Sequence, residues 1–145
     1  MKVIASGTFD RLHEGHKHFL MSAFKVGYVY IGLTSDTMTK NKEYSDSIQN
    51  YETRKDKLIQ YLSDENKNIG NDYQIIKIND RLGFAVESMD ADAIVVTSDT
   101  IATAEEINDA RAEYGLYPLN IIKVELVLKD NKKISSSDLR KEEKN

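Results

Sequence analysis

Three histidines are the residues of this chain whose type and spacing most directly suggest chemistry. His13, His16 and His18 fall within the stretch "LHEGHKHF", and no histidine occurs elsewhere. A zinc-protease helix needs the pattern His-Glu-x-x-His, and here the fifth position is Lys17. His13 and His16 lie about 60° apart on a helix and can share a face, whereas His18 lies about 160° from His16. Because cysteine is also absent, we predict no protein-held transition metal.

His16 is the best placed of the three for binding a phosphate. It extends by one turn the apolar row of a helix predicted over residues 14–26, formed by Leu20, Ala23 and Phe24, and so faces the sheet. Gly15 lets a ligand approach the backbone, and the first turn offers N–H groups and a partial positive charge. Thr8, in the preceding turn, adds a hydroxyl group. These features predict a phosphate site with an imidazole beside it, whereas His18 falls on the polar face and receives no role.

The elements that must position this site alternate between strands and helices. Apolar runs predict strands over residues 2–6, 28–34, 72–78, 93–97 and 119–128. Helical spacing predicts helices over residues 14–26 and 51–62 and short helical pieces over 82–89 and 134–141. A further helix is expected to open with the capping box of Thr103 and Glu106 and to close at Gly115. The polar stretch from Thr37 to Asn50 shows no apolar periodicity and is predicted to be a long, irregular loop.

This alternation predicts an α/β fold with a parallel sheet. We expect a single Rossmann-like domain over residues 1–145, with a five-stranded parallel sheet and helices on both faces. Ligands of such folds bind outside the carboxyl ends of the strands, at the point where the strand order reverses. The segment "SGTFDRLHEGH" leaves the first predicted strand at that edge, which is where the phosphate site is expected.

Composition and charge narrow the class of protein. The chain carries a formal charge of −4 and no basic stripe, which argues against a nucleic-acid partner. No apolar run approaches the roughly 20 residues of a membrane span, and the N-terminus reaches Gly7 too early for a signal peptide. Together with the absence of cysteine, this predicts a cytoplasmic protein without a membrane partner. The oligomeric state does not follow from the sequence.

Two motifs resemble the signatures of the nucleotidyltransferase superfamily that carries a His-x-Gly-His motif. "SGTFDRLHEGH" matches the first signature in register at Gly7, Thr8, Phe9, Asp10, His13, Gly15 and His16. "ISSSDLR" is similar to the second, Ile-Ser-Ser-(Ser/Thr)-x-x-Arg. The segments "KVGYVYIGLTSDTM", "YETRKDKL", "IVVTSDT" and "INDARAEYGL" resemble the archaeal and eukaryotic type of phosphopantetheine adenylyltransferase within it. "KISSS" stands where cytidylyltransferases usually carry Arg-Thr-x-Gly-Ile-Ser-Thr-Thr, which favours ATP over CTP.

The resemblance implies an adenylyl transfer reaction that belongs to coenzyme A biosynthesis. The phosphate of 4′-phosphopantetheine attacks the α-phosphate of ATP and gives dephospho-coenzyme A and pyrophosphate. Because the attacking group is already an anion, catalysis rests on alignment and charge stabilisation rather than on a general base. Mg²⁺ is expected to arrive with ATP. The alternatives are an adenylyltransferase acting on nicotinamide mononucleotide or flavin mononucleotide, and a non-catalytic nucleotide-binding module.

The resemblance also implies roles for the residues of the first motif. His16 donates a hydrogen bond to the α-phosphoryl oxygens, and Thr8 positions the acceptor phosphate or the α-phosphate. His13 contacts the β- or α-phosphate, or alternatively starts the helix by bonding a backbone carbonyl. Phe9 and Gly15 complete this part of the ATP site.

The second motif is expected to hold the far end of the triphosphate. Ser135, Ser136 and Ser137 suit the β- and γ-phosphates at a positive helix end. The structural alternative is ordinary capping, for which one serine would suffice. Arg140 is expected to make a charge-assisted contact to the leaving pyrophosphate.

Three further residues have roles that the sequence leaves open, and a fourth is expected to be structural. Lys40 or Lys42 clamps the acceptor phosphate, or is a solvated surface lysine. Arg111 shares a helix face with Asn108 and either contacts a substrate phosphate or forms a structural salt bridge. Asp10 is expected to bond turn amides rather than to take part in chemistry.

Overall fold

A parallel β-sheet forms the centre of the fold in the computed structural model of this chain, which describes residues 1–39, 47–80, 82, 90–125, 128–129 and 132–133. The sheet is five-stranded, with the order β3-β2-β1-β4-β5 and every pairing parallel. Its strands are β1 (Lys2–Gly7), β2 (Tyr28–Thr34), β3 (Tyr73–Ile78), β4 (Ala93–Val96) and β5 (Asn120–Lys123). The predicted α/β fold class and five-stranded parallel sheet are therefore confirmed.

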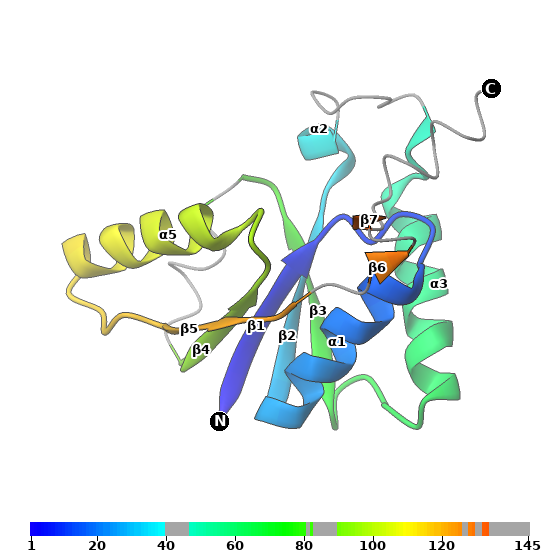
Figure 1. Cartoon of the computed structure of the whole chain (residues 1–145), viewed down its shortest axis with the longest axis horizontal. Coiled ribbons are helices and arrows are strands. Elements are labelled where there is room, and N and C mark those ends of the chain that lie inside the picture. The colour runs from blue at the N-terminus through cyan, green and yellow to red at the C-terminus, as the bar shows by residue number, and fades with distance from the viewer. Residues whose placement is uncertain (40–46, 81, 83–89, 126–127, 130–131, 134–145) are drawn as a thin grey trace.

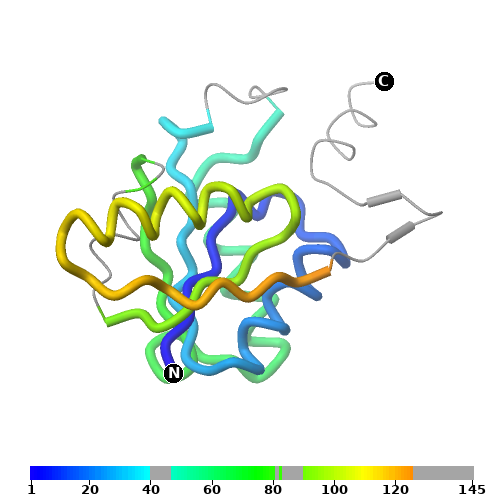
Figure 2. The backbone as a smooth tube through the Cα atoms, turned by 60° about the vertical axis from the view of Figure 1, so that its left-hand side comes forward, coloured from blue at the N-terminus to red at the C-terminus, as the bar shows by residue number. Residues whose placement is uncertain are grey.

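Helices cover both faces of this sheet (Figures 1 and 2). α1 (Glu14–Val26) and α3 (Tyr51–Asp64) lie on one face, and α5 (Ile101–Glu113) lies on the other. Successive residues of β1 serve opposite faces: Val3 is buried in one apolar cluster with Leu20 of α1 and Leu58 of α3, whereas Ile4 is buried in another with Ile107 of α5. The apolar run over residues 3–5 of β1 and the wholly apolar sequence of β4 follow from burial on both sides.

The central position of β1 creates the expected ligand edge. β1 pairs with β2 along its whole length, from Lys2 opposite Tyr28 to Gly7 opposite Leu33, and with β4 on its other side. The chain moves outward through β2 and β3 on one side and through β4 and β5 on the other, so the strand order reverses beside β1. The loop that leaves Gly7 therefore lies at the switch point, where ligands of such folds bind.

The local helix predictions hold for α1 and for the end of α5. α1 spans the predicted residues 14–26, and Gly115, just beyond α5, adopts the left-handed φ of 73° that suits a helix end. No helix in the described part of the chain is long and apolar enough to cross a membrane.

Three element predictions need correction. α5 begins at Ile101, whose N–H donates to the Thr97 carbonyl at 3.1 Å, so the predicted capping box of Thr103 and Glu106 lies inside the helix. The strand predicted over residues 119–128 is divided: β5 ends at Lys123, and β6 (Leu128–Lys129) pairs antiparallel with β7 (Lys132–Lys133) in a separate sheet. α2 (Asp36–Thr39) opens the stretch that was predicted to be irregular. The predicted helical pieces over 82–89 and 134–141 lie outside the described residues, apart from residue 82.

Candidate active site

The loop between β1 and α1 is a strained turn at the carboxyl edge of the sheet. Phe9 and Arg11 adopt φ angles of 49° and 51°, which residues other than glycine seldom do. The Phe9 ring is buried against the end of β1, and a Cβ atom at position 7 would come 3.2 Å from its Cζ atom. Gly7 therefore makes room for the ring, and contacts elsewhere in the fold must hold the strained loop in place.

His13 caps the N-terminus of α1 with its imidazole. Its Nδ1 accepts hydrogen bonds from the backbone N–H groups of Gly15 at 3.0 Å and His16 at 3.4 Å. The Nδ1 of His16 accepts in return from the His13 N–H at 3.4 Å, which completes a reciprocal capping box. His13 thus starts the helix, as the structural alternative held, and its Nδ1 accepts from two backbone amides. Its contact with a phosphate stays a prediction.

This cap changes the expected role of the helix amides. The N–H groups of Gly15 and His16, which were expected to face a phosphate, donate to His13 instead, and the Lys17 N–H donates to the His13 carbonyl at 3.0 Å. Gly15 is itself buried in α1. A phosphate at this helix end would therefore meet side chains first, with the partial positive charge of the helix behind them.

His16 lies between two aromatic neighbours that fix its ring. It stacks on His13 with 3.9 Å between ring centroids and 18° between planes, and it meets Phe9 edge-on at 5.6 Å and 70°. Because its Nδ1 accepts a backbone hydrogen bond, the hydrogen of the neutral imidazole is assigned to Nε2. His16 thus carries its donor on the nitrogen remote from the cap, which suits the predicted hydrogen bond to a phosphoryl oxygen.

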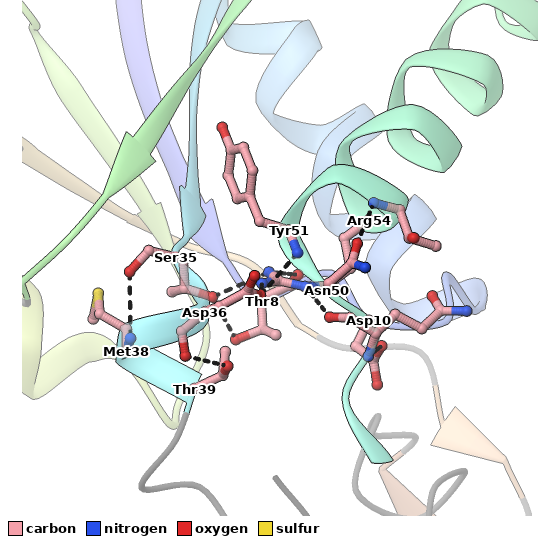
Figure 3. A network of polar contacts seen from close by, with 12 residues as sticks. Thr8, Asp10, Ser35, Asp36, Met38, Thr39, Asn50, Tyr51 and Arg54 are labelled. Carbon is pink, nitrogen blue, oxygen red and sulfur yellow. Dashed lines mark hydrogen bonds and ion pairs between the residues drawn. The ribbon is translucent and has the colours of Figure 1, made fainter. Parts of the chain in front are cut away.

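Thr8 belongs to a hydrogen-bond network centred on the fully buried Arg54 (Figure 3). The Arg54 Nη1 donates to the Thr8 carbonyl at 3.0 Å and to the Thr34 Oγ1 at 3.4 Å, and the Thr34 hydroxyl bonds the Thr8 Oγ1 at 3.0 Å. The Nε donates to the Gln49 carbonyl at 2.8 Å, and the Nη2 meets the Asp36 Oδ1 at 3.2 Å. One guanidinium therefore joins the end of β1, the end of β2 and the start of α3.

Asp10 and Arg11 fasten the same loop to the segment that precedes α3. The fully buried Asp10 accepts from the Gln49 N–H at 2.9 Å through Oδ1 and from the Arg11 Nη1 at 2.8 Å through Oδ2. Arg11 also donates to the Ser47 carbonyl at 2.6 Å. Asp10 thus bonds a backbone amide, and the Gln49 amide that it bonds lies in a distant segment of the chain.

The N-terminus of α3 is tied to the residues that follow β2. The Asp36 Oδ1 accepts from the Tyr51 N–H at 2.8 Å as well as from Arg54. The Tyr51 ring is buried, with the Lys77 Nζ 4.6 Å from its centroid. Burial raises the pKa of the Tyr51 hydroxyl, Glu52 raises it further and Arg54 opposes the shift. Tyr51 is therefore a neutral packing residue at ordinary pH.

Arg111 contacts the connection between α5 and β5. Its side chain is buried in the last turn of α5, and its Nε donates to the Tyr117 carbonyl at 2.8 Å. Burial lowers the pKa of this guanidinium. Asn108 exchanges two hydrogen bonds with the Leu119 backbone, at 2.7 and 3.0 Å. These contacts agree with a structural role for Arg111, and its contact with a substrate phosphate stays a prediction.

The remaining predicted site residues lie outside the described residues: Lys40, Lys42, Ser135, Ser136, Ser137 and Arg140. Their contacts to phosphate groups stay predictions. Within the described ranges, no group of three or more His, Cys, Asp or Glu side chains is arranged to hold a metal ion.

Arg54 and Thr34 are the two site residues that the sequence analysis did not single out. Arg54 stands in the buried row of α3, which also contains Tyr51, Leu58 and Leu62. An arginine in the buried row of an amphipathic helix is rarely accommodated without specific partners, and this pattern could have revealed it. Thr34 carries no comparable signal, because a threonine at the end of a strand is unremarkable.

Comparison with known proteins identifies the family of this chain. Residues 4–142 match the family model described as cytidylyltransferase-like. The phosphopantetheine adenylyltransferase of Pyrococcus abyssi is 49% identical over 96% of this chain and 88% of its own length, and that of Methanosarcina acetivorans is 42% identical over 98% and 90%. A protein of unknown function from Archaeoglobus fulgidus has a similar structure, with a TM-score of 0.75, 30% identity and coverage of 93% of this chain and 100% of its own. This chain therefore belongs to the cytidylyltransferase-like family and, within it, to the group of the archaeal phosphopantetheine adenylyltransferases.

Proposed function

We propose that this chain transfers the adenylyl group of ATP to 4′-phosphopantetheine and so serves coenzyme A biosynthesis. The products are dephospho-coenzyme A and pyrophosphate. The observation that carries the proposal is that Thr8 and His16 both lie at the switch point of the sheet, in the loop after β1 and the first turn of α1, in a chain whose relatives bear that enzyme name. We further propose that residues 1–145 act as one cytoplasmic domain.

In the proposed reaction, an oxygen of the acceptor phosphate attacks the α-phosphorus of ATP. The new P–O bond forms while the bond from the α-phosphorus to the bridging β-oxygen breaks, and pyrophosphate carries away the electron pair. The acceptor is already ionised, so no proton has to be removed from it. Catalysis then depends on holding the two phosphates in line and on stabilising the charge of the transition state.

The described residues supply both requirements. The Nε2–H of His16 donates to a non-bridging α-oxygen as negative charge grows there, and the ring is held for this by His13 and Phe9. The Thr8 hydroxyl positions the acceptor phosphate or the α-phosphate. Because Arg54 and Thr34 hold Thr8 in place before any ligand binds, little reorganisation is needed during the reaction.

The same proposal assigns the contacts of the remaining phosphate groups of the two substrates. Mg²⁺ enters as part of the MgATP substrate and shields the phosphate charges. Lys40 or Lys42 holds the acceptor phosphate, and the serines from Ser135 to Ser137 with Arg140 hold the β- and γ-phosphates.

The test is pyrophosphate release by the purified protein. MgATP or MgCTP is combined with 4′-phosphopantetheine, nicotinamide mononucleotide or flavin mononucleotide, and each product is identified by mass. We expect turnover with ATP and 4′-phosphopantetheine, far above every other pair. Faster turnover with either mononucleotide would reassign the acceptor. ATP binding without pyrophosphate release in the presence of any of the three acceptors would indicate a nucleotide-binding module.

A further inference from the structure

We propose that Thr34 and Arg54 are positioning residues for Thr8, which together set the direction in which the Thr8 hydroxyl donates. This inference rests on the proposed function, because it assigns Thr8 a phosphate oxygen as its partner. Neither residue belongs to the two motifs that resemble the superfamily signatures. Both act on the reaction through Thr8, without touching substrate.

The direction follows from the donor and acceptor chemistry of the chain of contacts. A guanidinium has donors and no acceptor, so the Thr34 Oγ1, 3.4 Å from the Arg54 Nη1, accepts in that contact. The Thr34 hydrogen is then available for the Thr8 Oγ1 at 3.0 Å, and Thr8 accepts in its turn. A hydroxyl oxygen can accept two hydrogen bonds, so it is the position of the Thr8 Oγ1, the acceptor that the Thr34 hydrogen meets among the described residues, that completes the assignment of Thr34 as the donor.

This direction is the one that a phosphate ligand needs. Ionised phosphate oxygens only accept hydrogen bonds, so a threonine that binds one must donate its hydrogen to it. If Thr8 donated to Thr34, its single hydrogen would be directed into the protein. Because Thr34 donates to Thr8, the hydrogen-bond chain that starts at Arg54 runs toward the edge of the sheet and agrees with a phosphate as its last acceptor.

Arg54 also fixes the backbone of Thr8. The same Nη1 that contacts Thr34 donates to the Thr8 carbonyl at 3.0 Å, immediately before the positive φ of Phe9. Thr8 is thus held both at its carbonyl and at its hydroxyl. Thr34 is buried, 8% exposed, at the last position of β2, so its own place is set by the sheet rather than by the loop.

The experiment removes the Thr34 hydroxyl and leaves its shape. Thr34→Val should lower kcat about ten-fold with the KM for ATP changed less than about three-fold, since one positioning hydrogen bond in the transition state corresponds to roughly one decade of rate. Thr34→Ser keeps the hydroxyl and should stay within about three-fold of the wild type in kcat. Thermal melting of both variants checks that the fold is intact. The test addresses Thr34 because Arg54 variants risk unfolding.

A double-mutant cycle separates positioning from a merely structural role. If Thr34 acts through Thr8, Thr34→Val should cost less than about two-fold in a Thr8→Val background, because the hydroxyl that it directs is already gone. Equal costs in both backgrounds would overturn the proposal, and so would a Thr34→Val enzyme that is as fast as the wild type or a Thr34→Ser enzyme that is as slow as the valine variant.

Failure of the proposed function would look different. In that case the wild type releases no pyrophosphate with 4′-phosphopantetheine, and the same cycle is measured on the dissociation constant of MgATP by calorimetry. Coupling between the two threonines in that measurement would support the positioning role with another acceptor in place, and additive effects there would overturn it.

Discussion

Replacing His16 by asparagine separates its two roles, in the helix cap and in catalysis. The His16 Nδ1 accepts from the His13 N–H at 3.4 Å, and the Nε2 carries the hydrogen. An asparagine amide oxygen can reach roughly the place of Nδ1 and so keep this cap, but no atom of asparagine reaches the place of Nε2. His16→Gln is the matched control, because its amide nitrogen extends to about the position of Nε2 while the Nδ1 acceptor is lost.

The size of the effect follows from what each variant loses. Loss of one preorganised donor to the transition state should lower kcat of His16→Asn by about 10²- to 10³-fold, or about 2.7–4 kcal/mol. The fold loses the stacking on His13 and the edge contact with Phe9, worth about 0.5–1.5 kcal/mol each. For a domain of this size, such losses should lower Tm by roughly 2–9 °C, which leaves the variant folded at assay temperature.

The assay is pyrophosphate release with both substrates varied, with Tm measured on the same preparations. We expect a fall in kcat with little change in the KM for ATP, and a recovery of about ten-fold or more in His16→Gln relative to His16→Asn. A folded His16→Asn enzyme within a few-fold of the wild-type kcat would refute the role of Nε2. So would a higher KM for ATP at unchanged kcat, because that pattern marks ground-state binding.

Three further predictions concern stability and the metal. Arg54→Met should lower the free energy of unfolding by about 2–5 kcal/mol, measured by urea denaturation, because the carbonyls of Thr8 and Gln49 lose their donor; an unchanged midpoint would contradict this. Tyr73→Phe should leave that free energy unchanged or raise it by up to about 2 kcal/mol, because the buried Tyr73 hydroxyl has no hydrogen-bond partner among the described residues; a clear loss would point to one elsewhere. EDTA should stop pyrophosphate release reversibly without changing the Tm of the ligand-free protein, since Mg²⁺ is proposed to arrive with ATP; a lowered Tm would indicate a metal held by the protein itself.

Sequence reasoning succeeded where the relevant signal is local. α1 was predicted over the residues that it occupies because its apolar row and its terminal glycine lie within one short stretch. The strands of the sheet were predicted because β1 and β4 are apolar runs bounded by polar residues. His16 was placed correctly at the carboxyl edge because the end of β1 and the apolar row of α1 are both visible in the nineteen residues from Ser6 to Phe24.

The same reasoning failed where a local pattern has two readings. Thr103 and Glu106 have the spacing of a capping box, but the turn that starts α5 is set earlier, by Thr97 and Thr100. The Thr97 carbonyl accepts from the N–H groups of Thr100 and Ile101, both at 3.1 Å. The run from 119 to 128 is apolar enough for one strand, yet residues 120–123 pair with β4, whereas Leu128 belongs to β6 and pairs with β7. Pairing is a tertiary event, and the apolar pattern alone does not limit its length.

The Arg54 network could not be predicted in detail because its members are far apart in the sequence. Arg54 contacts the Thr8 carbonyl across 46 positions, and Asp10 accepts from the Gln49 N–H across 39. Nothing in the sequence near Thr8 indicates either partner. The buried row of α3 could have marked Arg54 as unusual, but not which loops its guanidinium would join.

The His13 cap shows how the positive end of α1 can act on a phosphate without open amides. Two N–H groups of the first turn donate to the His13 Nδ1, and the His13 N–H donates to the His16 Nδ1, so each neutral imidazole carries its hydrogen on Nε2. When the Nδ1 of an imidazole accepts a hydrogen bond, the ring is polarised and its Nε2–H donates a stronger hydrogen bond. The positive end of the helix thus polarises two stacked imidazoles, whose N–H groups can act on a phosphate in place of the capped amides. For this reason His13 can be a structural cap and still contact a phosphate, and the two roles that the sequence left as alternatives are compatible in one residue.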